Sequence, residues 1–160
     1  MSKFLLLFAV LILALTSAHS QIPGKDGLTV NGVALNDTQA QVVKKLGKPS
    51  RVIEEAADEC VGGQVRTLYY PGLKVRVYGI ENKYSVGDFE VTSSRWSVSG
   101  AKVGMMQAAI TKRFGKASSS ETENGKKIWY YHFDVEAPGN SNFYFRNDKV
   151  VQIYSMYLMC

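Results

Sequence analysis

The segment Val30–Ser50, VNGVALNDTQAQVVKKLGKPS, returns as Val98–Ser118, VSGAKVGMMQAAITKRFGKAS, without a gap and at an offset of 68 residues. Eight of the 21 paired positions are identical. A duplicated unit this short cannot bury a large core alone, so the two copies are expected to pack side by side. The repeat therefore predicts architecture and says little about activity.

Each copy predicts a short amphipathic helix, over residues 37–46 and 105–114. In the first helix Thr38 and Gln41 have the spacing of a capping box, and Gly47 is placed to end the helix in a left-handed conformation. The second copy has methionines in place of the capping residues. The N-terminus of its helix is therefore expected to be less stable than that of the first helix, by about 1 kcal/mol.

Strand signals follow each helix, and turn residues such as Asn124-Gly125 separate them. The expected strands are 64–70, 73–79 and 84–93 in the first copy, and 126–135, 142–146 and 150–157 in the second. The fold class is therefore α+β, with two tandem helix-plus-antiparallel-meander modules that form a joint sheet with helices on one face. The first module is expected over residues 21–94 and the second over 95–160. With no Pro/Gly-rich linker between them, they should pack tightly.

The first twenty residues have the pattern of a signal peptide. Lys3 gives a positive start, Phe4 to Leu15 is apolar, and Ala18-His19-Ser20 is a cleavage site of the small-x-small form. The apolar run is too short for a transmembrane helix, and its lack of a polar face disfavours a buried N-terminal helix. We expect cleavage near Ser20, with cleavage after Ala18 as the alternative, and hence a periplasmic or secreted protein with no transmembrane segment in the mature chain.

The two cysteines, Cys60 and Cys160, are expected to form a disulfide in an oxidising compartment. A free C-terminal thiol and an intermolecular bond are the alternatives. The charge is modest: without Lys3, 19 − 1 = 18 basic residues face 14 acidic ones, scattered among each other. No basic stripe or reading motif indicates nucleic acid as a partner.

Period-two alternation divides the strands of the sheet into two faces. Trp129, Tyr131, Phe133 and Val135 are predicted on the core face, with Leu68, Tyr70, Val75, Val77, Phe143, Phe145, Val151 and Ile153 from other strands. The opposite face is predicted to carry Tyr69, Arg76, Tyr78, Tyr130, His132, Tyr144, Arg146 and Tyr154, together with Gln152 and Met156. Tyrosine and arginine are enriched in protein interfaces, although tyrosines are also ordinary strand residues on a half-wet face. We interpret this set as a protein-binding face.

The chain is poor in the groups that catalysis needs. His132 is the only histidine after the predicted signal peptide, and no hydrolase, zinc-protease or phosphate-loop motif occurs. The acids Glu54, Glu55, Asp58 and Glu59 are interpreted as a solvated patch on an exposed passage between strand and loop. The sequence therefore predicts no catalytic residue, no metal site and no cofactor. An enzyme would instead need a cleft that brings His132 and acids together.

The segment Leu35 to Pro49 has the form Leu-Asn-Asp-Thr-x-x-x-Val-x-x-x-Leu-Gly-Lys-Pro, and Val103-Gly104-Met105 precedes the second helix. These motifs resemble the superfamily shared by the SmpA/OmlA outer-membrane assembly lipoproteins and the β-lactamase inhibitor protein. The tandem arrangement looks most like the inhibitor protein, whose two modules form one concave sheet that grips its target. The chain departs from both: no lipid-anchor cysteine follows the apolar run, and two cysteines are fewer than one bridge per module requires.

The resemblance implies use of the open sheet face, and it transfers no individual binding residue. The hypothesis is an exported, non-enzymatic protein-binding module, of which a protein inhibitor is one form. The alternative is a component of envelope or outer-membrane assembly, or a scaffold. The sequence predicts neither the partner's identity nor the oligomeric state.

Overall fold

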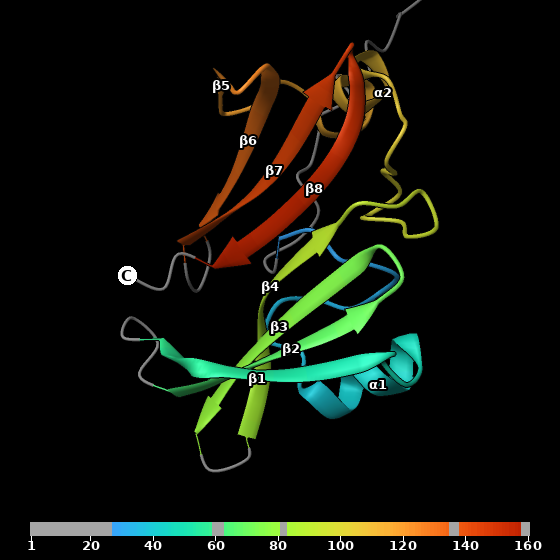
Figure 1. Ribbon diagram of the computed structural model, residues 1–160. Coiled ribbons are helices and arrows are strands. Elements are labelled where there is room, and N and C mark those ends of the chain that lie inside the picture. Colours follow the sequence, from blue (N-terminus) through green and yellow to red (C-terminus); the bar gives the residue numbers. More distant parts are fainter. Residues whose placement is uncertain (1–26, 59–62, 81–82, 135–137, 158–160) are drawn as a thin grey trace, which may run out of the picture.

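The computed structural model describes residues 27–58, 63–80, 83–134 and 138–157 (Figure 1). The elements, in chain order, are α1 (Gln39–Leu46), β1 (Arg51–Asp58), β2 (Gly63–Tyr70), β3 (Leu73–Ile80), β4 (Lys83–Val91), α2 (Gln107–Phe114), β5 (Ser119–Glu123), β6 (Lys126–Asp134), β7 (Pro138–Arg146) and β8 (Lys149–Tyr157). All eight strands form one antiparallel sheet in the order β1-β2-β3-β4-β8-β7-β6-β5. The predicted signal peptide, Val135 and both cysteines lie outside the described residues.

The predicted fold class, two tandem helix-plus-meander modules, is wrong. The protein is a single eight-stranded antiparallel sheet with two short helices, and β4 and β8 pair across its middle from Asp88–Met156 to Val91–Ile153. Each half contributes four strands, because β1 and β5 each pair along the outer edge of the expected three. These edge strands carry charged and hydroxyl side chains that suit a strand with one open edge but show no alternation of apolar residues.

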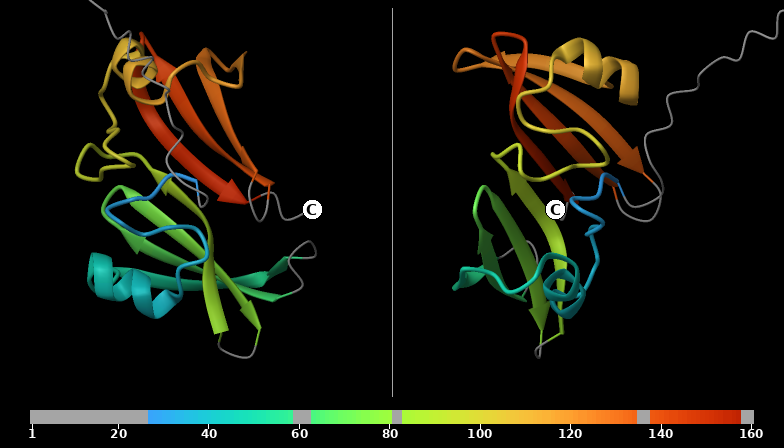
Figure 2. Two further views of the ribbon diagram at one scale, coloured as in Figure 1. Left: turned by 180° about the vertical axis from the view of Figure 1, so that it is seen from behind. Right: turned by 90° about the vertical axis from the view of Figure 1, so that its right-hand side faces the viewer.

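One hydrophobic core runs under both halves of the sheet. Val42 of α1 and Ile110 and Phe114 of α2 belong to the same buried cluster as the inward-facing residues of the strands. Phe114 packs at the centre of the second half, with ring centroids 5.9 Å from Tyr131 and 5.4 Å from Phe143. Both helices therefore lie on one face of the sheet (Figure 2), and no described element covers the other face.

The repeated segments meet each other at the middle of the molecule. The amide of Asn31 donates to the carbonyl of Ser97 at 2.9 Å, and the amide of Ser99 donates to the carbonyl of Thr29 at 2.8 Å. The 68-residue offset converts each of these hydrogen bonds into the other. The two copies are thus joined by a pair of hydrogen bonds that are related by local pseudo-twofold symmetry.

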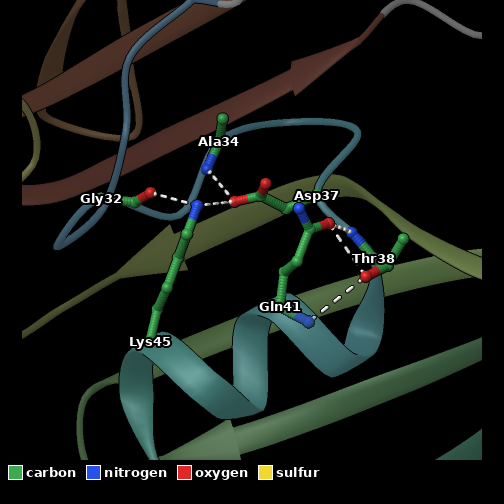
Figure 3. Close-up of polar contacts among 6 residues, drawn as sticks. All are labelled: Gly32, Ala34, Asp37, Thr38, Gln41 and Lys45. Carbon is green, nitrogen blue, oxygen red and sulfur yellow. Dashed lines mark hydrogen bonds and ion pairs between the residues drawn. The ribbon is translucent and has the colours of Figure 1, made fainter.

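The helix starts differ as their sequences predict. Thr38 caps α1 in a full capping box, with its hydroxyl accepting from the amide of Gln41 and the Gln41 side chain accepting from the amide of Thr38 (Figure 3). Met106 begins α2 without any side-chain cap. The helix ends are alike: the hydroxyls of Tyr70 and Tyr131 each donate at 3.0 Å to the carbonyl of the glycine that follows the helix.

A largely buried carboxylate fixes the loop before α1 to the helix. Asp37 accepts from the amide of Ala34 at 2.8 Å and from the ammonium of Lys45 at 2.6 Å, and Lys45 also donates to the carbonyl of Gly32 at 2.7 Å (Figure 3). The aspartate side chain is only 12% exposed. The lead-in loop and α1 therefore sit on the sheet as one unit, which leaves the opposite face free.

Candidate functional site

The uncovered face, here called the open face, carries two rows of side chains that cross all or most of the sheet. Residues that pair across antiparallel strands point to the same face, so the register defines each row. The first row is Arg51, Tyr69, Lys74, Glu90, Tyr154, Asn142, Tyr130 and Ser119. The second row is Ile53, Thr67, Arg76, Asp88, Met156, Asn140 and His132. Both rows pass without a break from the first half to the second.

The predicted binding residues take definite places on this face. Tyr69, Tyr130 and Tyr154 lie in the first row, and Arg76 and His132 lie in the second. Beside the rows, Tyr78 pairs with Ser85 and Tyr144 pairs with Gln152. Arg146 stands apart: it is exposed at the last position of β7, next to the turn into β8. The structure thus groups the predicted tyrosines and Arg76 on one surface and leaves Arg146 at its margin.

An ion pair with a buried carboxylate occupies the middle of the open face. The Nε of Arg76 lies 3.0 Å from the carboxylate of Asp88, and the Arg76 guanidinium also donates to the hydroxyl of Tyr154 at 2.9 Å. The hydroxyl of Tyr78 donates to Asp88 at 2.6 Å. The Asp88 side chain is 6% exposed and that of Arg76 is 38% exposed. A fixed, hydrogen-bonded charge pair therefore joins β3, β4 and β8 at the point where the two halves meet.

Burial shifts the acid–base behaviour of this group. It raises the pKa of the Asp88 carboxyl, although the hydrogen bond from Tyr78 and the charge of Arg76 oppose the increase. Burial, reinforced by the Asp88 charge, raises the pKa of Tyr154 to about 12. The pKa of Tyr78 is raised in the same way, by burial first and then by its bond to Asp88. The two tyrosines are thus held neutral, as hydrogen-bond donors, at every physiological pH.

Further polar pairs surround the ion pair in the first half. Lys74 and Glu90 lie 3.0 Å apart, and Glu90 also accepts from the side-chain amide of Gln152 at 3.2 Å. The hydroxyl of Thr67 donates to Glu55. These groups line a hollow of about 240 Å³, together with Tyr69, Arg76, Asp88 and Tyr154. The charged part of the open face is therefore concave, and its charged side chains already form ion pairs or hydrogen bonds within the protein.

Asp88 and Glu90 were not predicted at this site, and a β-bulge explains why. Val77 pairs with Val86 and Arg76 pairs with Asp88, so Gly87 is an extra residue in β4. The bulge shifts the alternation by one and turns Asp88 outward. An equivalent shift in β8 makes Val150 the buried residue opposite Phe145, where the sequence analysis had placed Val151 in the core.

The second half of the open face is aromatic and uncharged in both rows. The hydroxyl of Tyr130 donates to Glu121 of the edge strand, and this bond raises the Tyr130 pKa to about 12. The rings of Tyr130 and His132 lie parallel, with centroids 6.4 Å apart. Ser119 and His132 approach to 3.5 Å at the exposed end of the row. The halves thus offer a partner two different surfaces: the first has an ion pair at its centre, and the second has aromatic and amide side chains beside the Glu121 carboxylate.

The other chemistry of the molecule is sparse. Within the described ranges, no three His, Cys, Asp or Glu side chains gather in a way that could hold a metal ion. A larger hollow of about 920 Å³ lies between α1 and the start of β4, lined by residues such as Ala40, Val43 and Tyr84. It was not predicted, and it contains no group of reactive side chains. Neither described helix has the length and apolar composition that crossing a bilayer requires.

Comparison with known proteins finds no matching family model and no matching curated sequence. Solved structures with partial likeness include an extracellular SCP-domain protein of Bacillus anthracis (16% identity, TM-score 0.48, 78% of this chain and 44% of that one). A DUF4309 family protein of Bacillus subtilis has 12% sequence identity and a TM-score of 0.45, and the match covers 79% of this chain and 82% of that one. A cysteine-rich secretory protein of Staphylococcus aureus has 14% sequence identity and a TM-score of 0.48, and the match covers 78% of this chain and 43% of that one. The chain thus spans less than half the length of two of these proteins.

Proposed function

We propose that this chain is an exported, non-enzymatic protein-binding module that docks its partner on the open face of the sheet. The supporting observation is the pair of rows that cross the β4–β8 junction and present Tyr69, Tyr154 and Tyr130 on a surface that no described element covers. Tyrosine gives a large contact area with a polar end and little loss of rotamer freedom. The Arg76–Asp88 ion pair also links β3 and β4 at the centre of this face.

Inhibition of the bound protein is one form of this function. It is the form suggested by the resemblance of the repeat motifs to the β-lactamase inhibitor protein. Export follows from the predicted signal peptide, with the periplasm or the exterior as the destination. A panel of secreted hydrolases, assayed with and without the purified chain, tests the inhibitory form directly.

The test of binding compares two variants in the native exported fraction. The first is Tyr130→Ala with Tyr144→Ala on the open face, and the control is Lys48→Ala with Lys116→Ala, which changes exposed residues outside it. Circular dichroism and thermal unfolding show whether each variant folds. Covalent cross-linking with mass spectrometry should find a protein bound by the wild type and the control but lost from the tyrosine variant. Equal capture by all three proteins would refute the proposal.

Fractionation of the same cells separates the two hypotheses for the role. A freely released pool supports the binding module. Firm association with membranes in the absence of a lipid anchor supports the assembly or scaffold component instead.

A further inference from the structure

Two asparagines on the second half of the open face have buried side-chain oxygens. The Oδ1 atoms of Asn140 and Asn142 are covered and have no hydrogen-bond partner within the described residues. Asn142 is only 6% exposed. Leaving a buried polar group unpaired destabilises a protein by about 1–3 kcal/mol, so each such group in a folded protein requires an explanation.

The neighbours of these amides show that packing does not require them. In the first row Asn142 lies between Tyr130 and Tyr154, and in the second row Asn140 lies between His132 and Met156. Apolar or β-branched residues would fill such positions in a sheet without an unpaired group. Polar residues that lower stability without a structural gain are typical of binding sites.

We propose that Asn140 and Asn142 bind the backbone of an extended segment of the partner protein, which lies along β7 on the second half of the open face. This inference rests on the proposed function and names the kind of partner segment that the face accepts. A primary amide carries one acceptor oxygen and an NH₂ donor, which complement the N–H and C=O of a peptide group.

The spacing of the two amides fits an extended chain. Asn140 and Asn142 are alternate residues of one strand, so their side chains leave the sheet about 7 Å apart. The same interval separates alternate residues of any extended peptide, so both amides can pair with one segment. Its side chains would then lie against the flanking tyrosines and Met156.

Charge disfavours an acidic segment on this half of the face. The charged residues of both rows, Arg51, Lys74, Glu90, Arg76 and Asp88, all lie on strands of the first half. A partner's glutamate placed beside Asn142 would lose water, find no cation in either row of this half and lie near the Glu121 carboxylate, which Tyr130 contacts. An uncharged segment has no such penalty.

The covered oxygens require one side chain to move when the segment binds. Tyr154 is held by Arg76 at 2.9 Å in the buried network, whereas Tyr130 is held by Glu121 on an exposed edge strand. Tyr130 is therefore the neighbour that we expect to move, and its movement would release the Glu121 carboxylate at the margin of the bound segment.

The test selects binders and then removes the amides. A phage library of random dodecapeptides without Asp, Glu, Lys or Arg is selected on the whole exported chain, and the best peptides are synthesised with a fluorescent label. Fluorescence anisotropy then compares the wild type with Asn142→Leu and Asn140→Leu. The matched control is Gln64→Leu, an amide on the opposite side of the sheet whose oxygen already accepts from the hydroxyl of Tyr84.

We expect each asparagine variant to bind at least tenfold more weakly, and Asn142→Leu to unfold at an equal or higher urea concentration than the wild type. Gln64→Leu should keep its affinity for the peptide. Two peptides should be compared, one N-methylated at its odd-numbered residues and one at its even-numbered residues. One of the two should lose binding and the other should keep it, because alternate N–H groups of an extended chain point to opposite sides.

Three results would overturn the inference: no peptide selected above the library background, full affinity in both asparagine variants, or a lower unfolding midpoint for Asn142→Leu. The last result would mean that a bound water satisfies the amide and that its role is structural. If the tyrosine variants lose the natural partner while the asparagine variants keep it, the proposed function stands and the backbone recognition falls.

Discussion

Replacing Arg76 with methionine would leave the Asp88 carboxylate buried without its cation. Breaking a buried ion pair from one side destabilises a protein by about 3–5 kcal/mol. Two features reduce the loss here: the Arg76 side chain is 38% exposed, so water can reach the vacated space, and the Tyr78 hydroxyl still donates to Asp88 at 2.6 Å. We therefore expect Arg76→Met to lower the free energy of unfolding by about 2–3 kcal/mol at pH 7. For a domain of this size, that loss corresponds to a decrease of roughly 10 °C in Tm.

The loss should depend on pH in a definite direction. Removing the guanidinium removes an influence that lowers the Asp88 pKa, so the folded-state pKa of Asp88, already raised by burial, rises further in the variant. A carboxyl with a raised folded pKa stabilises the fold below its unfolded pKa, and this stabilisation is lost as the pH rises through the folded pKa. The difference between wild type and Arg76→Met should therefore shrink as the pH is lowered from 7 towards 4.

Urea unfolding followed by tryptophan fluorescence at pH 7, 5.5 and 4 measures this difference. Lys74→Met is the matched control, because Lys74 is 51% exposed and its pair with Glu90 should contribute less than about 1 kcal/mol. A loss in Arg76→Met no larger than that of the control, or one that is constant over the three pH values, would contradict the account of the buried pair.

Three further predictions concern other parts of the molecule. Thr38→Ala should lower the free energy of unfolding by about 1 kcal/mol, and Met106→Thr, which offers α2 the cap that it lacks, should raise it by a similar amount in urea titrations. Alkaline titration at 295 nm should show Tyr154 ionising near pH 12 rather than near 10, with folding stability lost above pH 10 because only the unfolded state ionises there. Gly72→Ala should lower the free energy of unfolding, measured by thermal unfolding, by more than about 1 kcal/mol. The φ angle of Gly72 is +75°, and the new Cβ would lie 2.2 Å from the Cβ of Ser93.

The sequence predicted the interior strands well because their side chains alternate. Leu68 and Tyr70 are buried in the core while Tyr69, between them, faces the other side, and the same holds for Phe143, Tyr144 and Phe145. Strands β1 and β5 were missed because an edge strand is held by backbone pairing and needs no apolar face. RVIEEAAD and SSETE therefore gave no periodic signal, and the count of strands in each half was wrong.

The tyrosines of the open face could be assigned from alternation, but its central ion pair could not. The extra Gly87 in β4 reverses the alternation between Val86 and Asp88, and a one-residue bulge leaves no mark in the composition of the strand. The pairing of Arg76 with Tyr154 depends on β4 lying beside β8, which joins residues 78 positions apart. By contrast, Asn140 and Asn142 could have been noted, because alternate asparagines before Phe143 and Phe145 already point away from the core.

The position of β8 between β4 and β7 determines the order in which the sheet can be assembled. Strands β1 to β4 are synthesised first, and β4 must then wait with one edge unpaired until α2 and β5 to β7 have been made. An unpaired edge beside the buried residues Phe89 and Val91 is a template for pairing with another chain. Changes that delay the arrival of β8 should therefore first be seen as aggregation of newly made chains, even where the finished fold is as stable as the wild type.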